Sequence, residues 1–101
     1  MVTIGIIIKI YFNSPSVPSL YKEYKKYFPI GVAIPASFID DPQKANLVEQ
    51  HFNSITSEWE MKPKAIAPKK GKYDFSAIDK YLEFAEKNNI RVRGHTLVWH
   101  I

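Results

Sequence analysis

Three short β-prone runs, separated by stretches with helical periodicity, constrain the fold of this chain most. The runs cover residues 30–34, 53–57 and 90–98, and each follows a segment whose apolar residues recur at helical spacing. Strands that alternate with helices form parallel βαβ units with right-handed crossovers. The sequence therefore predicts an α/β fold in the order helix, strand, helix, strand, helix, strand.

Capping residues predict where the helices begin and end. Asp41 followed by Pro42 is a strong start signal, because the carboxylate caps free N–H groups and proline fits the first helical turn. Pro29 ends the preceding helix. The other expected caps are Ser19 and either Asp74 or Ser76 at helix starts, and Asn88–Asn89 at the end of the last helix.

Apolar spacing predicts which faces are buried. The run at residues 30–34 is apolar throughout, so we expect a strand that is buried on both faces. The buried stripes expected for the second and third helices are Ala45, Val48 and Phe52, and Phe75, Ile78, Leu82 and Ala85.

The composition fits one small domain with a modest core. The chain has 101 residues and a net charge of +4, but its lysines are spread along the sequence and the dense run at residues 69–72 is typical of a solvated turn. We therefore expect no nucleic-acid partner. The chain has no cysteine, which excludes disulfides and thiolate metal sites.

Residues 1–18 are predicted to form an apolar leader and a linker. Residues 2–12 are interrupted by Lys9 and are shorter than the roughly 20 apolar residues that span a bilayer, so no membrane partner is expected. They also make a poor secretion signal, since no positive charge precedes them and no small-x-small cleavage site follows. Residues 13–18 carry two prolines and two serines, as linkers do.

Two polar and aromatic clusters follow the second and third predicted strands. Residues 58–62 follow one strand, and residues 95–100 lie at the end of the next. The carboxyl ends of parallel strands meet at one edge of the sheet, where ligands bind in such folds. The two clusters together predict a binding site at that edge.

Glu58 and Glu60 are the first candidates for chemistry. A retaining glycosidase pair is separated by roughly 5 to 5.5 Å and flanks the scissile bond from opposite sides. Residues two apart in an extended chain share one face, which disfavours a catalytic pair here. We expect Glu60 to face solvent or brace a loop, and Glu58 to bind ligand hydroxyls or brace the fold. Lys62 can donate to a sugar hydroxyl and can also pair with Glu58.

His95, Trp99 and His100 admit two interpretations. Two histidines can ligate zinc, but a zinc site needs three or four ligands and His51 has no visible relation to them, so no metal and no other cofactor is expected. In the favoured interpretation His95 donates to a ligand hydroxyl and His100 orients a carboxylate supplied from elsewhere. Trp99 either stacks on a sugar ring or packs under the rim of the site.

Both clusters resemble signatures of a known family. The run HFNSITSEWEMKP, from His51 to Pro63, resembles the second-strand signature of glycoside hydrolase family 10, the endo-1,4-β-xylanases. The run RGHTLVWH, residues 93–100, is very similar to the third-strand signature. Residues 31–41 and 71–75 resemble the family too. The resemblance covers residues 19–101 and implies a partial catalytic domain, the amino-terminal three strand–helix units of a (β/α)₈ TIM barrel.

The resemblance implies an enzyme that hydrolyses β-1,4-xylosidic bonds in xylan with retention. Xylan or a xylo-oligosaccharide would be the ligand, and secretion would follow for the parent enzyme because xylan is extracellular. Trp59 stands where the family usually has Asn, so the sugar subsite is altered, narrowed or lined by stacking. The residues implied to bind sugar on the non-reducing side of the cleavage point are Glu58, Lys62, His95, Trp99 and His100, with His100 close to the catalytic centre.

The catalytic glutamates of the family are not expected in this chain. The acid/base follows the fourth strand and the nucleophile ends the seventh, whereas the 101 residues reach the third strand. We therefore expect no catalytic residue here and no activity from this chain alone. The alternatives are a non-catalytic xylo-oligosaccharide-binding remnant and an unrelated basic βαβ interaction module.

Three strands of a closed barrel leave two open edges, and open edges invite aggregation. Most partners of residues 30–34 and of Ile55 would come from the missing strands. The chain alone is therefore expected to be marginally stable or aggregated, and to need the rest of the barrel for a closed fold.

Overall fold

The structure is a computed structural model that describes residues 17–100. The predicted leader at residues 2–12 and most of the linker lie outside the described residues. The helices are α2 (Leu20–Glu23), α3 (Ser37–Asp40), α4 (Pro42–His51), α5 (Pro63–Ile66) and α6 (Ser76–Asn88), and the strands are β1 (Gly31–Ile34), β2 (Ser54–Ser57) and β3 (Arg91–Arg93).

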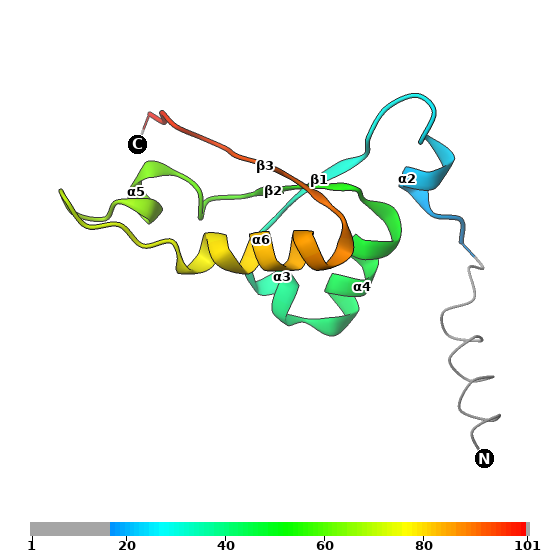
Figure 1. The fold of residues 1–101 in the computed structure, drawn as a ribbon, viewed down its shortest axis with the longest axis horizontal. Helices are drawn as coiled ribbons and strands as arrows, with labels where there is room; N and C mark the ends of the chain where they lie inside the picture. Colours follow the sequence, from blue (N-terminus) through cyan, green and yellow to red (C-terminus); the bar gives the residue numbers. More distant parts are fainter. Residues whose placement is uncertain (1–16, 101) are drawn as a thin grey trace, which may run out of the picture.

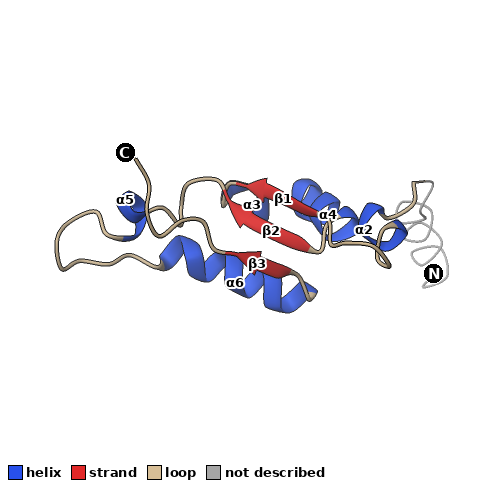
Figure 2. Ribbon diagram, turned by 90° about the horizontal axis from the view of Figure 1, so that it is seen from above, coloured by secondary structure: helices blue, strands red, loops and turns tan. Residues whose placement is uncertain are grey.

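The three strands form one parallel sheet in the order β1-β2-β3. Ile55 of β2 lies between Val32 and Val92 in the register, so the side chains of these three residues share one face. Each crossover contains helices, and α4 and α6 lie on the same side of the sheet (Figures 1 and 2). The predicted alternation of strands and helices is confirmed.

The core fills the space between the sheet and these helices. Ile34 and Ile55 are almost fully buried there, and the hydroxyl of Tyr81 donates to the carbonyl oxygen of Ile34 at 2.5 Å. The expectation that Ile34 and Ile55 lack packing partners is wrong, because their side chains face the helices and not the barrel interior. The buried apolar residues are Ile34, Ala45, Val48, Ile55, Met61, Tyr81, Phe84, Ala85 and Ile90.

The other face of the sheet has no covering layer among the described residues. Along β1, exposure alternates, with Gly31 and Ala33 exposed and Ile34 buried. The expected burial of this strand on both faces is therefore wrong for the described chain. The residues on the open face are small or polar: Gly31, Ala33, Ser54, Thr56, Arg91 and Arg93.

The caps predicted at Asp41 and Asn89 are present, whereas the N-cap position of α6 is Phe75 and α2 ends at Glu23, well before Pro29. Asp41 Oδ1 accepts hydrogen bonds from the backbone N–H groups of Gln43 (3.0 Å) and Lys44 (3.4 Å). Asp74 accepts from both the hydroxyl and the N–H of Ser76, which lowers the pKa of its carboxyl group. Asn89 ends α6 in the left-handed conformation, with φ of 54°.

Ser19 precedes α2 but does not cap it with its side chain, since its hydroxyl donates to the carbonyl oxygen of Gln50.

Three local predictions are wrong. The last strand ends at Arg93, and not at residue 98, because the chain leaves the sheet at Gly94. The short helices α3 and α5 were not expected from periodicity. Phe75 and Leu82 are 51% and 48% exposed, whereas α6 buries Tyr81 and Phe84 together with the expected Ala85.

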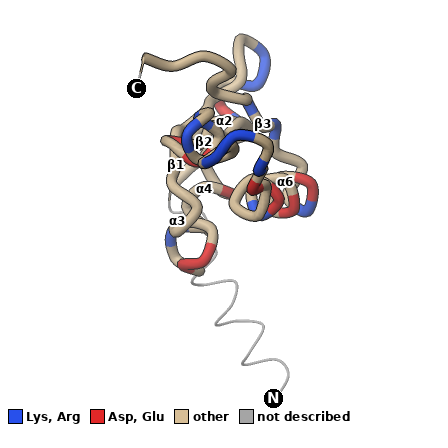
Figure 3. Tube along the Cα trace, turned by 90° about the vertical axis from the view of Figure 1, so that its left-hand side faces the viewer, with Lys and Arg blue, Asp and Glu red and all other residues tan. Residues whose placement is uncertain are grey.

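Charge is distributed unevenly over the elements. Acidic and basic positions both occur along α6, and the basic positions of β3 are its two arginines (Figure 3). Within residues 17–100, no helix is both long and apolar enough to cross a bilayer.

Candidate functional site

Both predicted clusters lie at the same end of the sheet. Residues 58–62 leave the carboxyl end of β2, and residues 94–100 leave the carboxyl end of β3. Figure 1 shows the two segments running to the same side, with α5 close to the carboxyl terminus of the chain. The predicted location of the site is where parallel α/β folds place ligands.

Trp99 lies at the centre of this end. The Lys62 ammonium lies 4.1 Å from the centre of the Trp99 ring, a cation–π contact. His95 meets the ring edge-on at 5.3 Å, and His100 lies at 4.7 Å in a tilted arrangement. The structure therefore brings together four of the five predicted binding residues, which form the Trp99 cluster: Lys62, His95, Trp99 and His100. The peptide bond between His95 and Thr96 is cis.

Trp99 itself is 38% exposed, so its side chain is not buried beneath the rim of the site. The predicted ion pair between Lys62 and Glu58 is absent, because the only ion pair among residues 17–100 joins Lys80 to Asp40 at 2.8 Å.

Glu58 stands apart from the Trp99 cluster. Its side chain is exposed, and in the described part of the chain no hydrogen bond or ion pair engages its carboxylate. Its backbone N–H donates to the carbonyl oxygen of Ile34, which fixes the start of the loop after β2. Among residues 17–100 the Glu58 carboxylate has no partner, so it can accept a hydrogen bond from a ligand at the rim.

Glu60 is a buried anchor. The residue is only 5% exposed, and its Oε1 accepts from the backbone N–H of Ala36 at 2.6 Å. Its Oε2 faces the hydroxyls of Ser57 (2.9 Å) and Tyr81 (3.0 Å) and the N–H of Trp59 (3.3 Å). The predicted loop-bracing role is confirmed and the solvent-facing alternative is wrong. A catalytic pair with Glu58 is excluded, because Glu60 points into the core and Glu58 points outward.

The hydrogen bonds of Glu60 control its charge. Burial opposes ionisation, but donors from Ala36, its own backbone, Ser57 and Tyr81 together hold the pKa of the carboxyl group below its usual value. The pKa of Tyr81 is raised, first by burial and then by the neighbouring Glu60 carboxylate. Glu60 is therefore an anion at neutral pH that joins β1, β2 and α6 beneath the site.

Two hollows open beside the Trp99 cluster. One, of about 480 Å³, is lined by Trp59, Lys62, Lys64, Ala65 and Trp99. The other, of about 430 Å³, has His95 among its lining residues, together with Met61 and residues of α5. Sequence reasoning did not assign Lys64 or Ala65 to the site. Both lie on α5. Pro63, which begins this short helix, is the sequence signal that could have placed them beside Trp99.

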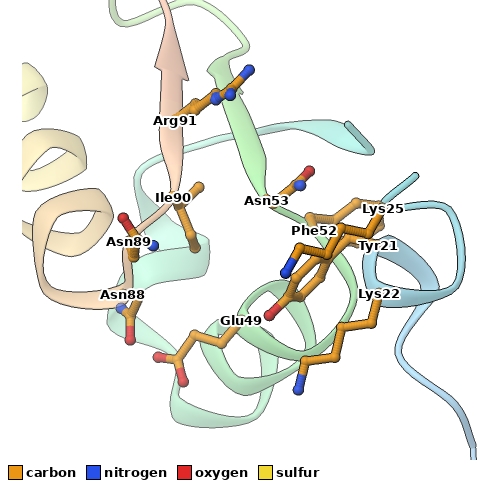
Figure 4. Close-up of a pocket in the computed structure, with 10 residues that line it drawn as sticks. All are labelled: Tyr21, Lys22, Lys25, Glu49, Phe52, Asn53, Asn88, Asn89, Ile90 and Arg91. Carbon is orange, nitrogen blue, oxygen red and sulfur yellow. The ribbon is translucent and has the colours of Figure 1, made fainter. Parts of the chain in front are cut away.

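A third hollow, of about 550 Å³, lies at the opposite end of the sheet. Figure 4 shows its residues, which include Lys22 and Lys25 of the α2 region, Glu49 of α4 and Arg91 of β3. These residues precede or begin the strands, so this hollow is at the amino ends and is separate from the predicted clusters. No sequence-predicted site residue lines it.

Metal ligands are not grouped in the described chain. Within residues 17–100, no three His, Cys, Asp or Glu side chains are placed to share one ion. His51 has a structural contact, because its Nδ1 accepts a hydrogen bond from the backbone N–H of Leu20 at 3.2 Å.

Comparison with known proteins identifies relatives over nearly the whole described chain. Residues 19–101 match the model of glycosyl hydrolase family 10. An endo-1,4-beta-xylanase A from Caldicellulosiruptor sp. (strain Rt8B.4) is 49% identical over 85 residues, which cover 84% of this chain and 12% of the relative. A beta-1,4-xylanase from Dictyoglomus thermophilum is 49% identical over 84 residues, 83% of this chain and 23% of the relative.

Solved structures share the fold. The endo-1,4-beta-xylanase of Caldicellulosiruptor owensensis superposes with a TM-score of 0.79 at 45% identity, covering 83% of this chain and 25% of that one. A mutant protein in complex with xylotriose gives a TM-score of 0.78 at 44% identity, covering 81% of this chain and 25% of that one. The chain thus spans about a quarter or less of the length of these relatives.

Proposed function

Because the chain belongs to glycosyl hydrolase family 10, we propose that its residues form the non-reducing-side wall of a xylan-binding cleft. Residues 19–101 correspond to the first three strand–helix units of the family barrel. When the barrel is closed, this wall holds a β-1,4-linked xylo-oligosaccharide for retaining hydrolysis by two glutamates on other strands. The substrate, the reaction and the residue roles are carried over from the family.

The arrangement around Trp99 carries the proposal. The exposed indole of Trp99 offers a flat apolar face to the C–H face of a xylose ring. His95 and Lys62 lie beside the indole and can donate hydrogen bonds to the hydroxyls of that xylose ring. Sugar hydroxyls both donate and accept hydrogen bonds, so they also need an acceptor, and Glu58 supplies it. By analogy with the family, we place His100, which contacts Trp99, close to the catalytic carboxylates of the closed barrel.

Lys62 has a specific part in this mechanism. Its ammonium occupies the face of Trp99 in the structure, and a sugar that stacks on that face takes its place. The displaced ammonium then donates to the hydroxyls of the bound ring, so the cation–π contact keeps the lysine in the site before the ligand arrives. The two interactions are alternatives, which makes Lys62 important for binding and less so for the chemical step.

A hybrid barrel tests the proposal. Residues 19–101 would replace the matching quarter of the Caldicellulosiruptor owensensis xylanase, and release of reducing sugars from xylan would be measured beside the unaltered parent. We expect hydrolysis with retention. A hybrid that folds, as judged by circular dichroism, yet releases no sugar would contradict the proposed function.

Variants of the hybrid test the roles of single residues. Lys62→Met and Glu58→Gln should each raise KM by roughly tenfold with a smaller change in kcat, because each removes a charged hydrogen bond to bound sugar. Lys70→Met is the matched control, since Lys70 is exposed in the loop before α6. Unchanged KM in both site variants would remove these residues from the site.

Binding without hydrolysis is the second candidate. Calorimetric titration of the 101-residue chain with xylobiose separates it from the first, because a chain that binds xylobiose while the folded hybrid is inactive would be a binding remnant. Membership in the family removes the alternative of an unrelated interaction module.

A further inference from the structure

We infer that Arg93, on the open face of the sheet, forms a buried ion pair in the closed barrel with a carboxylate on one of the strands that complete it. The inference goes beyond the proposed sugar-binding wall and does not depend on it, because it concerns the barrel interior beneath that wall. It assigns a partner of stated chemistry to a sheet face that residues 17–100 leave uncovered.

The strand pattern places Arg93 on the open face. Val92 packs against the core between the sheet and the helices, so its neighbours Arg91 and Arg93 point to the other side of the sheet. In the register, Thr56 lies beside Arg93, and Ala33 lies beside Thr56. These three residues form the last row of the open face within the strands, and the chain leaves β3 for the candidate site directly after it.

The open face carries positive charge and no negative charge. Within residues 17–100, this face consists of two arginines and four neutral residues: Gly31, Ala33, Ser54 and Thr56. The only ion pair in the same part of the chain joins Lys80 to Asp40, so neither arginine has a carboxylate partner there. A second copy of the chain on this face would oppose cation with cation, whereas an inward carboxylate would complement the charge.

Closing the barrel buries Arg93. The chain spans about a quarter of each solved relative, and the remaining strands of the family barrel cover the open face. Side chains from all strands fill a barrel interior in layers, and β1 adds only Gly31 and Ala33, which leaves room for a long side chain. A guanidinium stays charged and is costly to bury unless a carboxylate pairs with it. That carboxylate therefore comes from a strand outside residues 17–100.

Arg91 is the matched control on the same strand. It lies two residues nearer the amino end and lines the hollow of about 550 Å³ there, together with Lys25 and Asn89. Its guanidinium can therefore stay in contact with water at the amino-end opening of the barrel, and we expect no buried partner for it. The same substitution at positions 91 and 93 thus separates a surface charge from a buried, paired one.

Urea unfolding of the hybrid barrel tests the inference. Arg93→Met should lower the midpoint by about 1 M, because it leaves the partner carboxylate buried and unpaired. Arg91→Met should shift the midpoint by less than about 0.2 M. Without an anionic partner, removal of the buried Arg93 charge would instead raise the midpoint. An unchanged or raised midpoint in Arg93→Met would therefore overturn the inference.

Arg93→Lys keeps the charge but loses the planar fork of the guanidinium. Its midpoint should fall between those of the unaltered hybrid and Arg93→Met, and it supplies the comparison if the methionine variant does not fold. A hybrid that folds only after Arg93→Met would also contradict the ion pair.

A crystal structure of the hybrid gives the direct answer. We expect a carboxylate oxygen within about 4 Å of the Arg93 guanidinium. A guanidinium that contacts only water, or a second copy of the chain, would overturn the inference. Xylan hydrolysis measured in parallel keeps the two proposals apart. An active hybrid in which Arg93 lacks a carboxylate rejects the ion pair and keeps the xylan cleft, whereas an inactive hybrid with the pair in place does the reverse.

Discussion

Replacing Glu60 by Gln should destabilise the chain by more than any exposed substitution near the site. The carboxylate belongs to a residue that is 5% exposed, and it faces the hydroxyls of Ser57 and Tyr81 and the N–H groups of Ala36 and Trp59, which cannot reorient. An amide has one oxygen and one NH₂ group. Whichever way the new amide is turned, its NH₂ group faces a backbone N–H, and one buried donor loses its acceptor.

The better orientation of the amide keeps its oxygen toward Ser57, Trp59 and Tyr81. The NH₂ group then faces the N–H of Ala36, which loses a 2.6 Å hydrogen bond to a charged acceptor. A lost charge-assisted bond together with an unsatisfied, partly buried donor costs about 2 kcal/mol. With a urea m-value of about 3 kcal/mol per molar for the hybrid barrel, the midpoint falls by about 0.7 M.

Urea unfolding of the hybrid barrel, followed by far-UV circular dichroism, checks this magnitude, because the open-edged chain alone is expected to melt broadly. Glu58→Gln is the matched control, since it makes the same chemical change at an exposed carboxylate two residues away and should shift the midpoint by less than about 0.2 M. A double-mutant cycle with Tyr81→Phe should show coupling of at least about 0.5 kcal/mol, because the two groups share a hydrogen bond. A Glu60→Gln midpoint equal to that of the control would refute the anchoring role.

Four further outcomes follow from the structure. Stability should fall as pH drops below the ordinary value of 4.5 through the lower folded pKa of Glu60, and Glu60→Gln should lose this acid-dependent component in a pH series of urea curves. Asp41→Ala should lower the free energy of unfolding by about 1 kcal/mol through the lost cap, measured in the same urea assay. Asn89→Gly should be neutral or slightly stabilising, because glycine adopts the left-handed conformation at φ of 54° without strain, and a large loss would contradict this. The 101-residue chain should sediment as concentration-dependent oligomers or melt broadly, and a sharp cooperative melt of a monomer would contradict the open-edge argument.

The strand and helix order could be predicted because local signals and tertiary structure agree. Asp41, Pro42 and Asn89 act within a few residues of their own position, so their roles follow from sequence alone. The early end of β3 could not be predicted, because β-prone residues continue to position 98. What ends the strand is the lack of a pairing partner, since β2 itself ends at Ser57.

The positions of the site residues were predictable, but their contacts were not. Strand-end placement followed from the parallel topology, which brings residues 58–62 and 95–100 together. Lys62 was expected to pair with Glu58 because opposite charges lie close together in the sequence. The structure places the Lys62 ammonium on Trp99 instead, a residue distant in sequence, because the segment after β3 returns over α5.

Glu60 and Tyr81 show why burial cannot be read from residue type. The apolar stripe of α6 was expected to use Leu82, yet the buried position belongs to Tyr81, whose hydroxyl meets the Ile34 carbonyl oxygen and the Glu60 carboxylate. A polar group is tolerated there only because its partners come from β1 and from the loop after β2. The Glu60 carboxylate also accepts a hydrogen bond from the backbone N–H of Trp59. Glu60 therefore fixes the start of the loop after β2, on which the proposed sugar contacts depend. Stability and binding are thus expected to respond together at Glu60 and separately at Lys62, whose side chain contacts the site from its surface.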